Sequence, residues 1–316
     1  MSLDNLKVNL QYFLPKHLIS WGASVVANAK LGRCTTFAIS RFAKFYHVNL
    51  EEMDGEIRDF ETFNEFFSRP LKPNARPIDA DGDSVVFPVD GKISQFGDLR
   101  TELLLQAKGH YFSTETLLGD EADAKYFENG KFMTVYLSPS DYHRVHIPFA
   151  GRLLKMTYIP GELFSVNPLY TRNIPELLAR NERVVCIFDT AIGKMAVIFV
   201  GAVVVGSVST DWEGVVAPKN SLDMYVSTYE HENLEYDKGA EIGKFLMGST
   251  VICLFEKDKV DFVSGLECEQ ITRVGTKMAT ALGVEKTAPE KTKKTTAKVA
   301  AKTKTTVRKT KTAAKK

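Results

Sequence analysis

Residues 196–206 read AVIFVGAVVVG and form the longest apolar run of the chain. These eleven residues are too few to cross a bilayer as a helix, which takes about 20. Other β-type runs, bounded by Gly, Pro or Asp, are SVVFPV (84–89), KFMTVYLSP (131–139), GRLLKMTYIPG (151–161), RVVCIFDT (183–190), STVICLF (249–255) and VDFVSG (260–265). Strands at this spacing predict a mostly antiparallel β domain over residues 60–284, in which residues 101–128 and 173–181 form short helices.

Residues 1–59 have a different pattern, which predicts amphipathic helices. Apolar side chains recur at helical spacing in two sets, namely Leu14, Leu18, Trp21, Val25 and Ala29, and then Phe37, Phe42 and Phe45 or Tyr46. Basic side chains lie beside both sets, at Lys16, Lys30, Arg33, Arg41 and Lys44. Such helices lie in a membrane interface or pack their apolar side on the body of the protein. The sequence therefore predicts an α+β fold and leaves the partner of these helices open.

Charge is divided unevenly along the chain. The 41 basic and 39 acidic residues give a net charge of +2, yet residues 286–316 hold twelve basic residues and one acidic residue. This end carries +11, and the remainder carries −9. Residues 285–316 consist mainly of Lys, Thr and Ala with almost nothing to bury, which predicts a disordered tail. Such a tail attracts anionic lipid or nucleic acid, and we expect no specific recognition of a nucleic acid.

Two further features concern the compartment. The four cysteines are scattered and form no CxxC pair, which is typical of a reduced compartment and argues against a structural zinc site. The first residues, MSLDNLKVNLQYFLPKH, lack the pattern of a secretory signal peptide. We therefore expect a chain that is not integral to a membrane, although it can lie on one.

The segment DYHRVHIP (141–148) holds two histidines, His143 and His146, three residues apart. Neutral imidazoles are common metal ligands, and Asp90 or Asp141 could complete a site. The segment has neither an HExxH helix nor a set of cysteines, so the pattern for zinc is weak. Two histidines in an ordinary loop explain the segment equally well, and we expect no metal.

Two other motifs contain small residues at turns. PVDGKI (88–93) places Asp90 and Gly91 between two β-type runs, which predicts a tight hairpin turn. GKFLMGSTVICLF (243–255) places Gly248 and Ser249 directly before a strand. A turn of small residues before a strand is common, and the pattern differs from the GxSxG elbow of α/β-hydrolases.

A Gly-Ser pair has one particular chemical capacity. The serine hydroxyl can attack the preceding carbonyl, which glycine leaves accessible because it has no Cβ, and the amide then becomes an ester. This step needs a base, and a histidine oriented by an aspartate is the usual solution. Elimination and hydrolysis then leave a pyruvoyl group, whose carbonyl condenses with amines and withdraws electrons.

Taken in order, the motifs resemble those of the bacterial phosphatidylserine decarboxylase family. The similar stretches are TFNEFFSRPLKPNARPI (62–78), PVDGKI, DYHRVHIP, GELFSVNP (161–168), NERVV (181–185), VGAVVVGSV (200–208) and GST (248–250). The resemblance extends over residues 10–270 and implies a pyruvoyl-dependent lyase that converts phosphatidylserine to phosphatidylethanolamine and CO₂. Such enzymes are made as proenzymes that cut themselves between Gly and Ser of an LGST motif. Met247 replaces the Leu here, which nearly conserves volume.

The resemblance also implies roles for individual residues. Asp90, His146 and Ser249 would form the self-cleavage triad, with His146 as base, Asp90 orienting it and Ser249 as nucleophile. The cut would fall between Gly248 and Ser249, and Ser249 would become the pyruvoyl group. The substrate amine would then form a Schiff base with that group, and no metal is implied.

Further expectations concern the products of the cut and the substrate. The β chain (1–248) and the α chain (249–316) would stay together as a heterodimer, and a dimer of these heterodimers is left open. His143 is a candidate for phosphate contact or for returning the proton after CO₂ is lost. Ser165 and Asn167 are weaker candidates for lining the substrate pocket, since side chains of this kind often bond locally in a loop.

A lipid substrate changes the interpretation of the two charged or amphipathic ends. The helices within 1–59 become membrane-docking elements, and the association is expected to be peripheral, on the cytoplasmic face of the bacterial inner membrane. Anionic lipids there would attract the basic tail by about 1 kcal/mol for each Lys or Arg near the surface.

Two alternatives differ in their chemistry. A serine hydrolase would use Asp90, His146 and Ser249 but would leave the chain intact. A barrel-sandwich carrier module would need a modifiable side chain, such as Lys92 or His146, because PVDGKI and VGAVVVGSV also resemble turns of such modules. We take this second likeness as an indication of a barrel-sandwich-like β domain, not of function.

Overall fold

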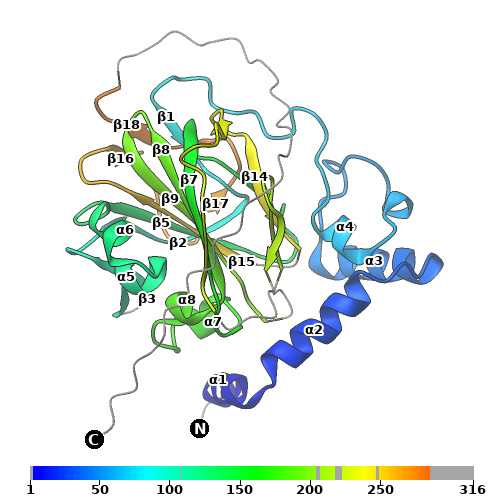
Figure 1. The fold of residues 1–316 in the computed structure, drawn as a ribbon. Coiled ribbons are helices and arrows are strands. Elements are labelled where there is room, and N and C mark those ends of the chain that lie inside the picture. The colour runs from blue at the N-terminus through cyan, green and yellow to red at the C-terminus, as the bar shows by residue number, and fades with distance from the viewer. Residues whose placement is uncertain (1–2, 108, 204–206, 218–222, 247–248, 285–316) are drawn as a thin grey trace, which may run out of the picture.

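The computed structural model describes residues 3–107, 109–203, 207–217, 223–246 and 249–284 (Figure 1). It shows helices at the N-terminus followed by mostly antiparallel sheets, which confirms the predicted α+β class. The predicted tail and Gly248 lie outside the described residues.

The N-terminal helices lie along one side of the β domain (Figure 1). They are α1 (Leu3–Phe13), α2 (Lys16–Ala27) and α3 (Arg33–Tyr46), followed by the 3₁₀ turn η1 (Ile57–Asp59) and α4 (Phe63–Phe67). The short helix α4 begins with a capping box, in which Thr62 accepts from the N–H of Glu65 and the Glu65 carboxylate accepts from the N–H of Thr62. An apolar cluster that includes Ile39 and Phe66 joins α3 to α4. The domain boundary at residue 59 stays a prediction, and this cluster contains residues from both sides of it.

The β domain is built around a large sheet of nine described strands. Their order is β12 (Tyr225–Thr228), β7 (Gly151–Ile159), β8 (Arg183–Thr190), β9 (Gly193–Val200), β15 (Ser249–Phe255), β5 (Lys131–Leu137), β2 (Gly91–Asp98) and β17 (Ile271–Thr272), with β13 (Glu235–Tyr236) also paired to β7. A second sheet has the order β11 (Gly214–Ala217), β10 (Val208–Thr210), β14 (Glu241–Phe245) and β6 (Arg144–His146). A third joins β1 (Ser84–Val86), β18 (Lys277–Ala281) and β16 (Val260–Phe262).

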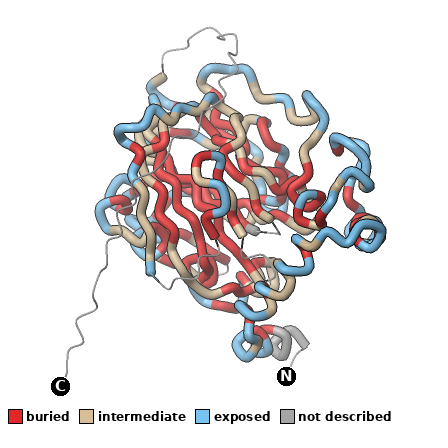
Figure 2. The backbone as a smooth tube through the Cα atoms, turned by 45° about the vertical axis from the view of Figure 1, so that its right-hand side comes forward, coloured by how far each residue is buried: buried red, intermediate tan, exposed pale blue. Residues whose placement is uncertain are grey.

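Both faces of the large sheet are buried, which explains the nearly continuous apolar run that begins at residue 196 (Figure 2). Along β9, Val197 and Phe199 join a core shared with the second sheet, whereas Ile198 and Val200 join a core on the other face. Short helices cover that other face, namely α5 (Thr114–Leu118), α6 (Glu121–Lys125), α7 (Pro168–Thr171) and α8 (Leu177–Arg180).

Two local expectations from the sequence were wrong. The first part of the segment 101–128 forms a hairpin of β3 (Leu103–Ala107) and β4 (His110–Ser113), and helices follow only from Thr114. The DGK motif does not close a hairpin, because β1 pairs with β18 whereas β2 pairs with β5 and β17. Asp90 and Gly91 instead mark the point where the chain passes from one sheet to another.

Candidate active site

Ser249 begins β15 at a crossover between two sheets. The preceding strand, β14, ends at Phe245 and pairs with β6, the strand that contains His146. β15 then enters the large sheet between β5 and β9. Gly248 and the side chain of Ser249 lie outside the described residues, so the register of the backbone locates the predicted cleavage point.

Strand register brings Asp90 and Ser249 to the same end of the large sheet. Ser249 pairs with Leu137 on one side of β5, and Lys92 pairs with Tyr136 on the other side. Because adjacent strands are spaced about 4.8 Å apart, the strand ends that carry Asp90 and Ser249 are separated by about 10 Å. Gly91 permits this approach, since a Cβ there would lie 2.3 Å from the carbonyl oxygen of Tyr136.

His146 is held with a defined proton arrangement. Its backbone N–H donates to the carbonyl of Pro88 at 2.8 Å, which ties β6 to the segment before Asp90. Its Nδ1 lies 2.8 Å from the carbonyl oxygen of Gly239, and its Nε2 lies 3.3 Å from the hydroxyl of Tyr142. A carbonyl can only accept, so Nδ1 carries the hydrogen, and the Nε2 lone pair accepts from the Tyr142 hydroxyl. Burial lowers the pKa of His146, which favours this neutral form.

Asp90 is 1% exposed and is bound by cations. Its carboxylate accepts from Arg76 Nε at 2.9 Å, from Arg273 Nη1 at 2.9 Å and from the backbone N–H of Val274 at 2.9 Å. Arg76 also donates to Glu52 at 2.8 Å. Among the described contacts, none joins Asp90 to His146, and the Gly239 carbonyl occupies Nδ1 instead. The structure thus places the two residues on adjacent segments without a hydrogen bond between them.

His143 is fully buried and has one free ring nitrogen. Its Nδ1 donates to the carbonyl of Asp141 at 2.9 Å, and its Nε2 has no hydrogen-bond partner among the described residues. The ring packs on Phe67 with 4.1 Å between centroids. Burial and, to a smaller extent, the charge of Arg69 lower the pKa of His143 to about 3, so the imidazole is neutral. The described residues contain no group of three or more His, Cys, Asp or Glu side chains that could hold a metal.

The GELFSVNP segment borders this end of the sheet. Val166 and Pro168 line a small hollow together with Lys92 and Tyr136. The Asn167 side chain accepts from the N–H of Leu169 at 3.0 Å and caps α7, whereas the backbone N–H of Ser165 donates to Gln11 Oε1 at 3.2 Å. A substrate contact by Ser165 or Asn167 stays a prediction.

Sequence reasoning missed the two arginines on Asp90 and the arginine beside His143. Arg69 and Arg76 lie in the quoted stretch 62–78, and Arg273 lies far along the chain. A buried aspartate requires paired donors, which gives a reason to look for cations but does not say which ones.

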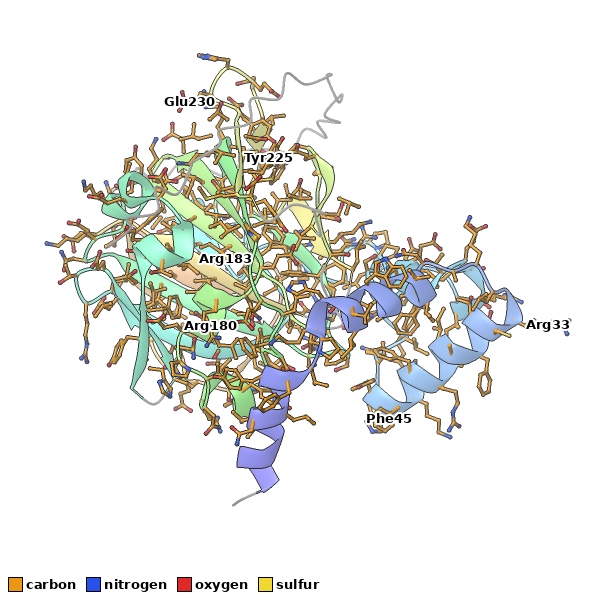
Figure 3. The ribbon with its side chains drawn as sticks, turned by 60° about the horizontal axis from the view of Figure 1, so that its bottom comes forward. Arg33, Phe45, Arg180, Arg183, Tyr225 and Glu230 are labelled. Atoms are coloured by element: carbon orange, nitrogen blue, oxygen red, sulfur yellow. The ribbon has the colours of Figure 1, made fainter. Side chains whose placement is uncertain are left out.

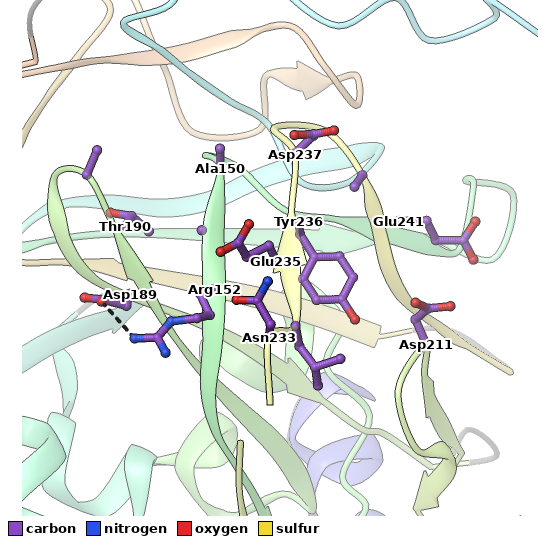
Figure 4. Close-up of a pocket in the computed structure, with 14 residues that line it drawn as sticks. Ala150, Arg152, Asp189, Thr190, Asp211, Asn233, Glu235, Tyr236, Asp237 and Glu241 are labelled. Carbon is purple, nitrogen blue, oxygen red and sulfur yellow. Dashed lines mark ion pairs between the residues drawn. The ribbon is translucent and has the colours of Figure 1, made fainter. Parts of the chain in front are cut away.

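A larger polar hollow, of about 720 Å³, lies elsewhere (Figure 4). Its lining includes Arg152, paired with Asp189 at 3.6 Å, and the nearby Gly151 and Thr190. Gly151 pairs with Thr190 at the end of β7 and β8 that is opposite to the end where Ser249 begins β15. None of the predicted catalytic residues lines this hollow, although Glu241 of its lining pairs with His146 between β14 and β6.

Comparison with known proteins decides the family. A family model described as phosphatidylserine decarboxylase matches residues 63–280, and one described as PSD matches residues 6–47. The chain belongs to the phosphatidylserine decarboxylase family. Phosphatidylserine decarboxylase proenzymes of Alteromonas mediterranea and Shewanella baltica are each 49% identical to it. The first match covers 93% of this chain and 92% of the relative, and the second covers 86% and 96%. The family consists of carboxy-lyases, so the resemblance noted in the motifs is confirmed and neither the hydrolase nor the carrier is favoured.

Proposed function

We propose that this protein decarboxylates phosphatidylserine at the crossover between β14 and β15, with a pyruvoyl group made from Ser249 by cleavage of the Gly248–Ser249 bond. The proposal is supported by membership of this family, by the pairing of β6, which contains His146, with β14, and by the start of β15 at Ser249 after that strand. The chemistry of each residue follows from its contacts.

His146 is the base for self-cleavage. Its Nε2 lone pair takes the hydroxyl proton of Ser249 while Gly239 holds Nδ1–H in place. The serine oxygen bonds to the carbonyl carbon of Gly248, the C–N bond breaks, and His146 returns the proton to the departing nitrogen. The resulting ester then eliminates, which frees the Gly248 carboxylate and leaves dehydroalanine, and hydrolysis of its imine form releases ammonia and leaves the pyruvoyl group. Two arginines hold Asp90 and so fix the segment that contains Pro88 and Asp90. The backbone N–H of His146 donates to the carbonyl of Pro88, so this segment also positions His146.

The described residues also fit a pyruvoyl group at the start of β15. His143 offers a fully buried Nε2 that has no partner among the described residues, and its carbonyl accepts from the N–H of Phe245 at 2.9 Å, close before the cleavage point in the chain. The pyruvoyl group supplies an electron-withdrawing carbonyl that binds the substrate amine. His143 Nε2 takes a proton from the substrate ammonium and returns it to the carbon that loses CO₂. Because burial disfavours its cation, the protonated imidazole is a strong acid for that second transfer.

The N-terminal helices supply the membrane contact. α2 buries Lys16, Ser20 and Ala27 and turns apolar side chains outward, the reverse of an ordinary surface helix. Exposed apolar residues along this side of the molecule are Phe13, Leu18, Trp21, Val25, Val26, Leu31, Phe37 and Phe45. Figure 3 shows Arg33 and Phe45 near the two ends of α3. None of the described helices is long and apolar enough to span a bilayer, and we propose peripheral docking on anionic lipid at the cytoplasmic face of the cell membrane.

One basic residue does not serve this contact. Lys16 is buried against the body, where it pairs with Glu162 at 2.9 Å and lies 3.8 Å from the centre of the Phe164 ring. Arg33, Arg41 and Lys44 are exposed beside the apolar residues of α3 and are the cations that can meet anionic headgroups. We propose that residues 285–316 add to this attraction. Removing residues 286–316 should weaken binding to anionic liposomes at low salt, and unchanged binding at low and moderate salt would rule out that role.

The two chains stay together after the cut because β15 lies inside the large sheet. It pairs with β5 over seven residues and with β9 over six, so removing it would expose both edges and two apolar cores. The Asp90–Arg273 ion pair also joins the proposed β chain to the proposed α chain.

Conversion of phosphatidylserine in detergent micelles tests the proposal. Wild-type protein should release CO₂ and phosphatidylethanolamine, and the Ser249→Ala variant should release neither. The His143→Asn variant should still cut itself but form product about 10²–10⁴-fold more slowly, the loss expected for a positioned proton carrier. His231→Asn, at an exposed histidine, is the control and should keep full activity. A fully cut wild-type protein that leaves phosphatidylserine unchanged would overturn the substrate assignment.

A further inference from the structure

Arg69 lies directly behind His143. It follows α4, is 3% exposed, and donates through Nη2 to the carbonyl of Ser140 at 2.9 Å and to that of Asp141 at 3.3 Å. The Asp141 carbonyl also accepts from His143 Nδ1 at 2.9 Å. A single carbonyl oxygen therefore links the guanidinium of Arg69 to the imidazole of His143.

We propose that Arg69 is a positioning residue for His143: by holding the Asp141 carbonyl, it keeps the hydrogen of His143 on Nδ1 and leaves Nε2 bare for the substrate. This inference rests on the proposed decarboxylation. It assigns a role to a residue of the FFSRPL stretch that the self-cleavage chemistry does not use.

The geometry selects one tautomer. With the hydrogen on Nε2 instead, a buried N–H would have no acceptor among the described residues, and the Nδ1 lone pair would face the lone pairs of the Asp141 carbonyl. Both effects oppose that form. If the Asp141 carbonyl were free to turn away, a hydrogen on Nδ1 would also lack an acceptor, so both preferences and the hydrogen bond that orients the ring would be lost.

The charge of Arg69 acts in the same direction. The carboxylate of Asp141 is engaged by the N–H and the hydroxyl of Ser138, each at 2.7 Å, and not by Arg69. Nε and Nη1 of Arg69 have no hydrogen-bond partner among the described residues, and the guanidinium carbon lies 5.4 Å from the centre of the Phe66 ring. The cation of Arg69 next to His143 disfavours a second positive charge on the imidazole, in keeping with the lowered pKa of His143.

The neighbouring aromatic residues complete the support. Phe66 lies under the guanidinium, and Phe67 lies against the His143 ring, so consecutive residues of α4 contact both partners. Arg144 Nε donates to the carbonyl of Ser68 at 2.9 Å. This bond also joins the segment after α4 to the segment of His143, but it does not involve the Asp141 carbonyl. The segment 66–69 therefore acts as a rigid backing for the turn that carries His143.

The test uses full-length protein and the variants Arg69→Met and Arg69→Lys. Methionine keeps much of the side-chain volume and removes every donor, whereas lysine keeps the charge and at least one donor. Arg152→Met is the matched control, because that arginine also donates to a backbone carbonyl, of Glu230 at 3.1 Å, but lies at the opposite end of the large sheet. For each protein we would measure self-cleavage by intact mass, kcat and KM on phosphatidylserine micelles, and the His143 tautomer by ¹⁵N NMR of histidine-labelled protein.

We expect Arg69→Met to cut itself and to lose kcat by about 10²-fold, the lower end of the range for a displaced proton carrier, with KM within about threefold of wild type. Its His143 signals should lose the pure Nδ1–H pattern. Arg69→Lys should fall between this variant and wild type, and Arg152→Met should match wild type in kcat and tautomer. If Arg69→Met does not fold, the same comparison is made with Arg69→Lys.

Several results would overturn the inference. The first is a wild-type kcat in the Arg69 variants. The second is a rise in KM at constant kcat, which would indicate that Arg69 contacts the substrate directly. The third is a loss of kcat with an unchanged His143 tautomer. Failure of the proposed function looks different, because the wild-type protein would then be cut and still not decarboxylate phosphatidylserine.

Discussion

The N-terminal helices and the crossover site depart from the usual burial of side chains in opposite directions. On α3, Phe37 and Phe45 are 68% and 75% exposed, whereas Asp90 and His143 at the crossover are 1% and 0% exposed. Exposed apolar clusters and buried polar groups are the informative exceptions to ordinary burial. The exposed apolar side chains of α3 indicate an apolar partner outside the chain. The buried polar side chains at the crossover indicate a catalytic role. A lipid-consuming enzyme needs both.

The largest effect should come from breaking the crossover site at His146. In His146→Ala the base for the attack of Ser249 is lost, so self-cleavage should slow by about 10²–10⁴-fold and one uncut chain should accumulate. Gel electrophoresis over time after translation measures the rate. His231→Ala, an exposed histidine, is the control. Cleavage of the His146→Ala protein at the wild-type rate would remove His146 from the mechanism.

A smaller effect, on membrane binding, should come from replacing exposed apolar side chains of the N-terminal helices with polar ones. The double variant Phe37→Ser and Phe45→Ser removes two exposed aromatic rings from α3. Each full burial of such a ring contributes roughly 1.5–3 kcal/mol, so binding to anionic vesicles should weaken by at least about tenfold. Self-cleavage should not change, because these side chains are exposed and belong to a helix outside the crossover site.

The matched control for this variant removes exposed apolar side chains from the β domain. Val215 and Ile271 are 62% and 67% exposed, so Val215→Ser and Ile271→Ser together expose comparable positions outside the helices. Vesicle sedimentation of both double variants measures the difference. Equal loss of binding in the two would contradict a specific docking role for the helices.

The smallest effect concerns the buried carboxyl of Glu182, which precedes β8 at the same end of the large sheet as Ser249. Burial raises the pKa of Glu182 to about 6, while its hydrogen bond from Tyr158 partly opposes that rise. A raised pKa means that the stabilisation from Glu182 is present below its ordinary pKa of 4.5 and is lost as pH rises through about 6. The loss amounts to about 2 kcal/mol.

Glu182→Gln should therefore flatten the fall in unfolding temperature between about pH 5 and about pH 8. The measurement is best made in a Ser249→Ala background, so that one intact chain unfolds. Glu232→Gln, at an exposed glutamate, is the control. An equally steep fall in the Glu182→Gln protein would show that another group causes the pH dependence.

The sequence predicted the class of the fold and the strands because their signals are local. An apolar run such as residues 196–200 indicates a strand that is buried on both faces. In the structure, alternate residues of this strand are buried in two different cores. The hairpin of β3 and β4 was missed because a short Leu-rich segment has no periodicity that separates a strand from a helix. The Asp90–Gly91 turn was taken for a hairpin because a turn motif does not say which sheet the next strand joins.

The site was predictable only in part, for a related reason. His143, His146 and Ser249 lie in short motifs with recognisable chemistry, and their roles remain predictions. The partners that set the state of each group, such as Gly239, Arg69 and Arg273, come from distant segments and depend on tertiary packing. Lys16 illustrates the same limit, since nothing in its helical pattern indicates that it faces inward onto Glu162.

Intact mass spectrometry of the wild-type protein beside Ser249→Ala tests the central claim most directly. We expect two wild-type chains, residues 1–248 and 249–316, with a pyruvoyl group at the start of the smaller chain, and a single uncut chain for Ser249→Ala. One intact chain of unmodified mass in both samples would contradict self-cleavage and, with it, the proposed chemistry at the crossover.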